Sequence, residues 1–327
     1  MNALLNLFVN PGFWYGVLRS TTPILLAALG SILANRAGIV NLGIEGMMLF
    51  GALFAVLVSG ATQSATMGLL ASVLICVAFS LALGYFKLKM KADEVLVGIA
   101  INLLAEGATI FLLFLAAGER ATSASVPSKM LPSIQIPFIQ NIPFLGRVLS
   151  NQNILMYVSI LLVFVVQYLL FQMPLGLRIR SVGGNPHSAE SVGVSVKKTQ
   201  YIALALSGVL IGLSGAFMSM GYMSVFTRGM TAGRGFIAMA AANVGGAVPI
   251  GALFASLLFG FFDSLGNNLQ GLTIPSEIIY MIPYVATIVA YSMVSYNRKK
   301  GGKSSKLMNR KKKESIVVQP DNQIDQL

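Results

Sequence analysis

Charged side chains are scarce in this 327-residue chain, which carries them at only 10% of its positions. A soluble domain carries about 25%. Hydrophobic residues make up 55% of the sequence and the mean hydropathy is +0.76, so the chain has too few polar residues to cover a water-exposed surface. The composition excludes a disordered chain, a disulfide scaffold, a coiled coil and an ordinary cytosolic enzyme. It predicts an all-α polytopic membrane protein.

Residues used for metal binding and catalysis are also few. The single cysteine, Cys76, lies in an apolar stretch, which excludes a disulfide framework and a cysteine-based metal site. The single histidine, His187, leaves few acid–base schemes open. The chain contains neither a G-x-x-x-x-G-K-[ST] phosphate loop nor an H-E-x-x-H motif. We therefore expect no metal, no cofactor and no catalytic residue, in a protein that is not an enzyme.

Positive charge is the one kind of charge in excess, with a net charge of +12. The basic residues lie between apolar segments and near the C-terminus, so we expect no nucleic-acid partner. Basic loops of membrane proteins stay on the cytoplasmic side. This rule predicts a cytoplasmic location for Arg36, the basic run at 87–91, the loop 174–200 and the C-terminus. The loop 118–151 is then external.

Apolar segments of about 20 residues are long enough to cross a bilayer as helices. They predict about nine transmembrane helices, within a range of roughly eight to ten, over residues 1–296. We expect residues 297–327 to form a basic, disordered cytoplasmic tail. A repeated GALFA sequence suggests two pseudo-repeated halves. The segments lie at 13–34, 38–59, 64–86, 93–117, 152–172, 200–221, 248–266 and 278–296, with a short one at 235–246 that suits half of a broken helix.

Polar residues interrupt two of these segments in pairs. Asn41 and Glu45 are four residues apart, as are Asn102 and Glu106, so each pair shares a face if its segment is helical. An intramembrane carboxylate is costly and normally faces the protein interior. Each pair is therefore open to two interpretations, as interhelical hydrogen bonds or as the lining of a solute pathway. For Asn41 and Glu45 we expect the structural role.

The loop 174–200 carries the signals of a short helix. Asn185 suits the N-cap, Pro186 the first helical position and Gly193 the C-terminal stop. A capped helix is unusual for a simple connector, so we expect this loop to form a surface that another protein binds. The alternative is a helix that lies flat on the membrane.

Three motifs in this chain resemble those of ABC-importer permeases of the ribose, simple-sugar and branched-chain amino-acid type. The family pattern G-x-N-P-x-A-A-x-x-x-G-I stands here as Gly184, Asn185, Pro186, Ser188, Ala189 and Gly193-Val194, with Ser for Ala and Val for Ile. RAGIVNLGIEGMMLFGA (36–52) and GRGFIAMAA (233–241) are similar to two further family segments. ANVGGAVPIGA departs from the F-G-x-W-x-P-x-G-A run of many members. The wording of the first two motifs is most similar to the nucleoside permeases linked to basic membrane lipoproteins.

The resemblance implies a permease subunit in a bacterial cytoplasmic membrane. Its partners would be an ABC ATPase, a second and often unlike permease, and an extracellular substrate-binding lipoprotein. The solute would be a nucleoside, or alternatively a simple sugar. The residues Gly184, Asn185, Pro186, Ser188, Ala189, Glu190 and Gly193 would then couple the permease to the ATPase.

Intramembrane polarity, rather than any family motif, provides the candidates for the pathway. These are Asn102, Glu106 and Asn243, with Phe236 for contact with a ring. A proton-coupled secondary transporter that uses Glu45 and Glu106 is the rival from a different class.

Overall fold

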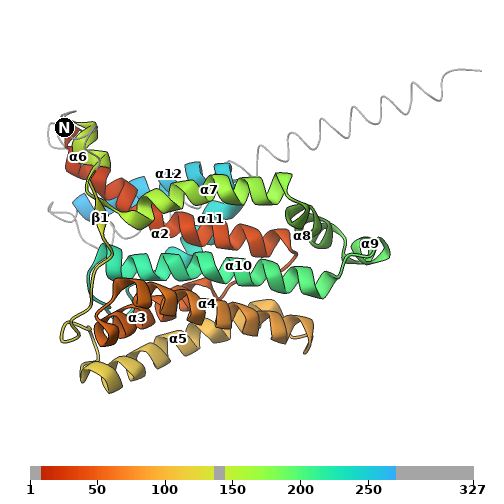
Figure 1. Cartoon of the computed structure of the whole chain (residues 1–327), viewed down its shortest axis with the longest axis horizontal. Coiled ribbons are helices and arrows are strands. Elements are labelled where there is room, and N and C mark those ends of the chain that lie inside the picture. The colour runs from red at the N-terminus through yellow and green to blue at the C-terminus, as the bar shows by residue number, and fades with distance from the viewer. Residues whose placement is uncertain (1–8, 136–143, 270–327) are drawn as a thin grey trace, which may run out of the picture.

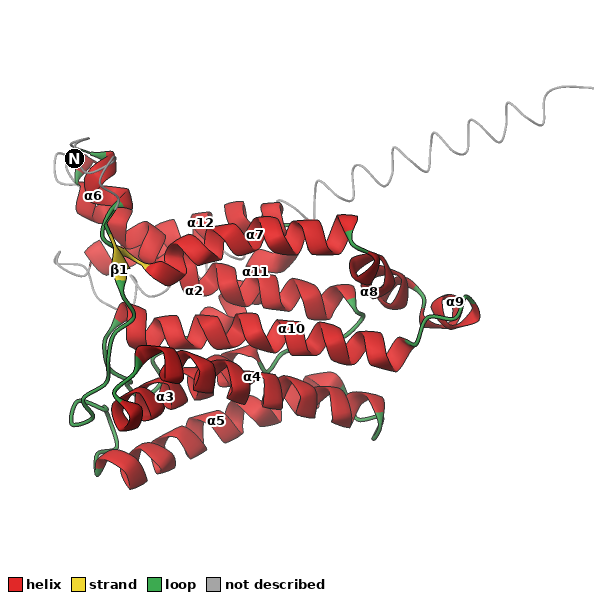
Figure 2. Cartoon of the chain, in the orientation of Figure 1, coloured by secondary structure: helices red, strands yellow, loops and turns green. Residues whose placement is uncertain are grey.

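A computed structural model describes residues 9–135 and 144–269, and helices make up most of it (Figures 1 and 2). Within these residues seven helices are long and apolar enough to cross a membrane. They are α2 (Pro11–Arg36), α3 (Ile44–Thr62), α4 (Ala65–Leu88), α5 (Glu94–Ala117), α7 (Ile154–Gln172), α10 (Val196–Ala216) with its continuation η1 (Phe217–Tyr222), and α12 (Pro249–Leu269). The chain is thus a multi-pass membrane protein, as its composition predicts.

The remaining elements are short. The helices are α6 (Leu145–Leu149), α8 (Pro174–Gly184), α9 (Pro186–Ser191) and α11 (Arg234–Val244). The strands β1 (Ser133–Ile134) and β2 (Gln152–Asn153) pair antiparallel, with Ser133 opposite Asn153 and Ile134 opposite Gln152. This small hairpin lies within and just after the segment predicted as an external loop.

Each apolar segment predicted up to residue 269 coincides with a helix, and the short segment 235–246 is the short helix α11. The predicted span 278–296 and the tail 297–327 lie outside the described residues, so the total of about nine helices stays a prediction. The two GALFA sequences fall within α3 and α12. The repetition of two halves likewise stays a prediction.

The segment predicted over 38–59 begins later than expected, at Ile44. Asn41 therefore precedes α3 and does not share a helix face with Glu45. Its side-chain oxygen accepts a hydrogen bond from the backbone N–H of Gly43 at 3.0 Å. Asparagine side chains compete with the helix in this way by bonding the backbone two residues on. Glu45 is thus a residue of the first turn of α3 rather than of its interior.

The segment 174–184, which precedes the short helix predicted within the loop 174–200, forms a helix of its own, α8. Pro174 stands at its first position, where the missing N–H costs nothing. Ile179 and Val182 are buried three residues apart, on one face of the helix. That spacing was available in the sequence as a helix signal.

The centre of the bundle is built by α2 and α10, which pack against each other. Helix α10 also packs against α3 and α4, and α2 packs against α11 and α12. Small residues bring α10 close to α4. A Cβ on Gly212 would lie 2.6 Å from the Cα of Val73, and the hydroxyl of Ser72 donates to the carbonyl of Gly212 at 2.7 Å. The glycines of this segment therefore serve close helix packing.

The two ends of the bundle differ in what they carry. Helices α8 and α9 lie at one end, and β1 and α6 lie at the opposite end (Figure 1). The connection from α4 to α5 lies at the α9 end, so that two of the predicted basic regions share one end.

Candidate functional site

A carboxylate binds the start of the half-length helix α11. One oxygen of Glu45 accepts from the backbone N–H of Gly233 at 2.8 Å, and the other accepts from Gly235 at 2.7 Å. The first N–H groups of a helix have no partner within it, and the helix dipole makes this end positive. Gly233 adopts a left-handed φ of 80° as the chain enters α11. Glu45 therefore completes this helix end with both of its oxygens.

Further charges surround the same helix end. Arg234 forms an ion pair with Asp263 of α12 at 3.2 Å, and its guanidinium lies 5.7 Å from the ring centroid of Tyr222. Arg19 of α2 lies 4.5 Å from the same centroid and donates to the carbonyl of Tyr222. The cluster holds two positive and two negative groups, so its charges balance. Arg234 and Asp263 pair with each other, Glu45 binds the helix end and Arg19 binds Tyr222, so each charge has the partner that a low-dielectric interior requires.

Arg19 and Arg234 were not among the sequence candidates. The sequence did contain a signal for them, because two apolar segments carry acidic residues, Glu45 and Asp263, that need cations. The sequence does not show which residues these cations contact, because Arg19 lies 203 residues from Tyr222.

Asn102 is engaged by the backbone at the start of α3. Its amide oxygen accepts from the N–H of Gly46 at 2.8 Å, and its amide nitrogen donates to the carbonyl of Leu42 at 2.9 Å. Both amide functions thus hold α5 to α3. This geometry favours the interhelical interpretation of Asn102 over the lining of a pathway.

The other pathway candidates are exposed. Glu106 is exposed near the middle of α5, and Phe236 and Asn243 are exposed on α11. The last two are seven residues apart and so lie on one face of that helix. Both α5 and α11 pack against α3, which makes α3 their common support.

The predicted helix in the loop is present as α9. The side chain of Asn185 accepts from the N–H of Ser188 at 3.2 Å, and Pro186 opens the helix. At the other end Gly193 has a φ of 82°, its N–H bonds the carbonyl of Glu190, and Val194 bonds Ala189. These bonds form the left-handed stop that glycine favours.

Most residues of α9 and its flanks are exposed in the described chain. Glu190 is exposed, as are Gly184, Asn185, Pro186, Ser188 and Gly193, and only Ala189 is buried.

The end of α8 is fastened to a corner of the bundle. A Cβ on Gly183 would lie 2.1 Å from the carbonyl oxygen of Arg36, so only glycine fits there. The guanidinium of Arg36 donates to the carbonyl of Ala247, in the turn between α11 and α12, at 2.8 Å. Arg36 therefore links the end of α8, which leads into α9, to the C-terminal end of α11. Glu45 binds the other end of α11.

Among the described residues, no group of three or more His, Cys, Asp or Glu side chains could hold a metal ion.

Comparisons with known proteins show the family to which the chain is similar. A model of the family described as branched-chain amino acid transport system / permease component matches residues 14–291. The chain is 38% identical over 281 residues to the guanosine ABC transporter permease protein NupQ of Bacillus subtilis (strain 168), covering 82% of this chain and 87% of the relative. It is 34% identical over 284 residues to the nucleoside ABC transporter permease protein NupC of Lactococcus lactis subsp. cremoris (strain MG1363), covering 84% and 89%.

One solved structure has a similar fold. It is a metal-chelate type ABC transporter in an inward-facing conformation, with a TM-score of 0.50 and 16% identity, covering 86% of this chain and 85% of the other. At this identity the likeness concerns the fold alone.

Proposed function

Because the chain belongs to the branched-chain amino acid transport permease family, whose model spans residues 14–291, we propose that it is the permease of an ABC importer for nucleosides. The importer moves its solute through this chain and a second permease, while a separate subunit hydrolyses ATP. The observation that carries the proposal is α9, a capped helix that presents an exposed face at one end of the bundle. Such a helix transmits movement by rigid contact.

The orientation of the chain follows from its basic residues. The α9 end carries the lysines and arginines of the 87–91 run and of the loop 174–200, so we assign this end to the cytoplasm. The ATPase then contacts α9, and a substrate-binding lipoprotein contacts the opposite end.

The choice of a nucleoside rests on two observations. Relatives that cover more than four-fifths of this chain are named for guanosine or nucleosides. In addition, the positive end of α11 is already bound by Glu45, and the charges around it balance. Among the described residues, the charged groups around this helix end already have partners, so this helix end suits a neutral solute better than an amino acid. A simple sugar is the second candidate on the same ground.

Glu106 needs cover in the assembled importer. A carboxylate that faces lipid at mid-span costs about 3 kcal/mol on insertion scales. Glu106 is exposed in the single chain, so a second subunit or a water-filled pathway covers it in the assembly. Proton coupling through Glu45 is disfavoured, because both of its oxygens accept backbone hydrogen bonds.

The test of the coupling role is Glu190→Arg. Removing one member of a desolvated charge pair costs about 2–5 kcal/mol, and even 2 kcal/mol weakens docking about thirtyfold. We expect the ATPase no longer to co-purify with the variant and guanosine uptake to be lost, with normal membrane insertion. Glu119→Arg, the same change at an exposed residue of the opposite end, is the control and should retain the ATPase. Normal ATPase binding and uptake by Glu190→Arg would contradict the proposal.

A further inference from the structure

One face of α5 carries features that a lipid-facing surface does not need. Glu106 and Gly107 are both exposed there, and a Cβ on Gly107 would have no atom within 4 Å. The exposed face of α4 around Leu74, by contrast, carries the apolar side chains of Met67 and Leu70. The α5 face is therefore different in kind from an ordinary lipid contact.

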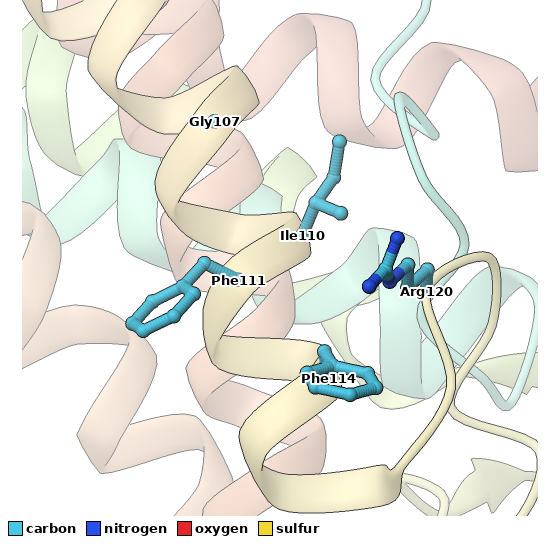
Figure 3. A pocket seen from close by; sticks show the side chains of 5 residues that line it. All are labelled: Gly107, Ile110, Phe111, Phe114 and Arg120. Carbon is cyan, nitrogen blue, oxygen red and sulfur yellow. The ribbon is translucent and has the colours of Figure 1, made fainter.

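A groove runs along this face toward the end opposite α9. Its volume is about 280 Å³, and Gly107, Ile110, Phe111, Phe114 and Arg120 line it. Figure 3 shows Ile110 and Phe111 projecting on either side of the helix, one turn beyond Gly107. Gly107 thus leaves open space at the floor, between an aliphatic and an aromatic wall.

Arg120 closes the far end of the groove. Its guanidinium lies 4.9 Å from the ring centroid of Phe114, and Figure 3 shows the two side chains beside each other. Arg120 follows directly after α5 ends and is exposed. A planar guanidinium held against a ring presents its remaining N–H donors as a flat fork.

This combination matches one class of solute. Aromatic side chains stack on a nucleobase, and an arginine fork donates to two neighbouring acceptors, O6 and N7 of a guanine ring. Adenine has a donor in place of O6 and pairs instead with an amide side chain. We propose that this groove receives the base of a 6-oxopurine nucleoside and that Arg120 selects it. The proposal rests on the nucleoside function given above and assigns the selectivity to named residues.

The lone native cysteine allows a direct test, because Cys76 is buried. We would introduce Gly107→Cys, a site with room for the side chain, into the complete transporter in membrane vesicles. A hydrophilic thiol reagent should label this cysteine, and guanosine should slow the labelling about tenfold more than adenosine does. With Arg120→Gln added, the order of the two nucleosides should reverse. Leu74→Cys on α4 is the lipid-facing control and should resist the reagent.

Uptake provides the second readout. Gly107→Trp fills the groove and should lower guanosine uptake at least tenfold, whereas Leu74→Trp, on the exposed face of α4 and outside the groove, should retain it. Co-purification of the ATPase with every variant establishes that the chain is folded. Resistance of Gly107→Cys to the reagent, as under lipid or a second subunit, would overturn the proposal. So would labelling that neither nucleoside slows. If wild-type vesicles take up no nucleoside at all, the nucleoside function itself is wrong.

Discussion

Single side chains around Tyr222 decide how three helices meet. Arg19 comes from α2, Arg234 from α11 and Asp263 from α12, and the two guanidinium groups lie against the same ring. A long cationic side chain needs a carboxylate or a ring wherever water is scarce. The position of α11 within the bundle therefore depends on these contacts as much as on apolar packing.

The ion pair between Arg234 and Asp263 provides a prediction at this scale. Both side chains are largely buried, so Arg234→Asp should lower the thermal midpoint of the detergent-solubilised protein by several degrees, because removing one partner costs about 3–5 kcal/mol. The double variant Arg234→Asp with Asp263→Arg should recover part of the loss. Thermal unfolding followed by fluorescence measures both. Equal midpoints for the single and double variants would show that the pair contributes nothing specific.

Asn102 makes a second prediction possible. Asn102→Asp keeps the acceptor for Gly46 but loses the donor to Leu42, whereas Asn102→Ala loses both. Each lost hydrogen bond costs about 1 kcal/mol. The aspartate also introduces a negative charge, so Asn102→Ala is the clearer variant. We expect a protease to cleave the solubilised Asn102→Ala protein faster than the wild type. Wild-type resistance of Asn102→Ala, with lost uptake, would instead support a role in the pathway.

At the scale of elements, the helix α9 depends on its stop. Gly193→Val places a β-branched residue at a φ of 82°, which only glycine adopts without strain. We expect α9 to lose its last turn and the ATPase to bind at least tenfold more weakly. Gly118→Val is the matched control, because it makes the same change at another left-handed glycine (φ of 71°), at the C-terminal end of α5 and away from α9. Pull-down of the ATPase measures the difference, and equal binding by both variants would contradict the coupling role.

Such local signals explain why α9 and α11 were predictable. Asn185, Pro186 and Gly193 act through their own backbone, and the apolar run 235–246 is visible without knowledge of its neighbours. The start of α3 was not predictable in the same way. Asn41 ends the preceding turn by bonding Gly43, a choice that competes closely with continuing the helix.

The candidate site was predictable only in part, for a related reason. Intramembrane polarity identified Glu45, but its partner is the end of a helix far along the chain. Asn102 was identified as polar and interior, but its partners are backbone atoms, which no side-chain pattern reveals. In the sequence, Arg120 is an ordinary basic residue just beyond an apolar segment. Only the structure shows its contact with the ring of Phe114.

At the scale of the whole molecule, the assigned orientation can be tested with added cysteines. His187→Cys lies on the exposed surface of α9, and Ala124→Cys is exposed in the segment between α5 and β1. An impermeant thiol reagent should label Ala124→Cys in intact cells and His187→Cys only in inverted vesicles. The buried Cys76 supplies a silent background. Labelling of both positions from the same side would overturn the orientation and the ATPase contact with it.

The bond between Glu45 and α11 also has a consequence for biosynthesis. The ribosome makes Glu45 188 residues before the amide of Gly233 that it binds. Until then α2 to α10 can enter the membrane, but a carboxylate in α3 has no helix end to neutralise it. A chain that stalls before residue 235 therefore holds an exposed charge within the bilayer. That charge distinguishes an unfinished chain from a finished one, and a membrane protease has a physical basis for removing only the former.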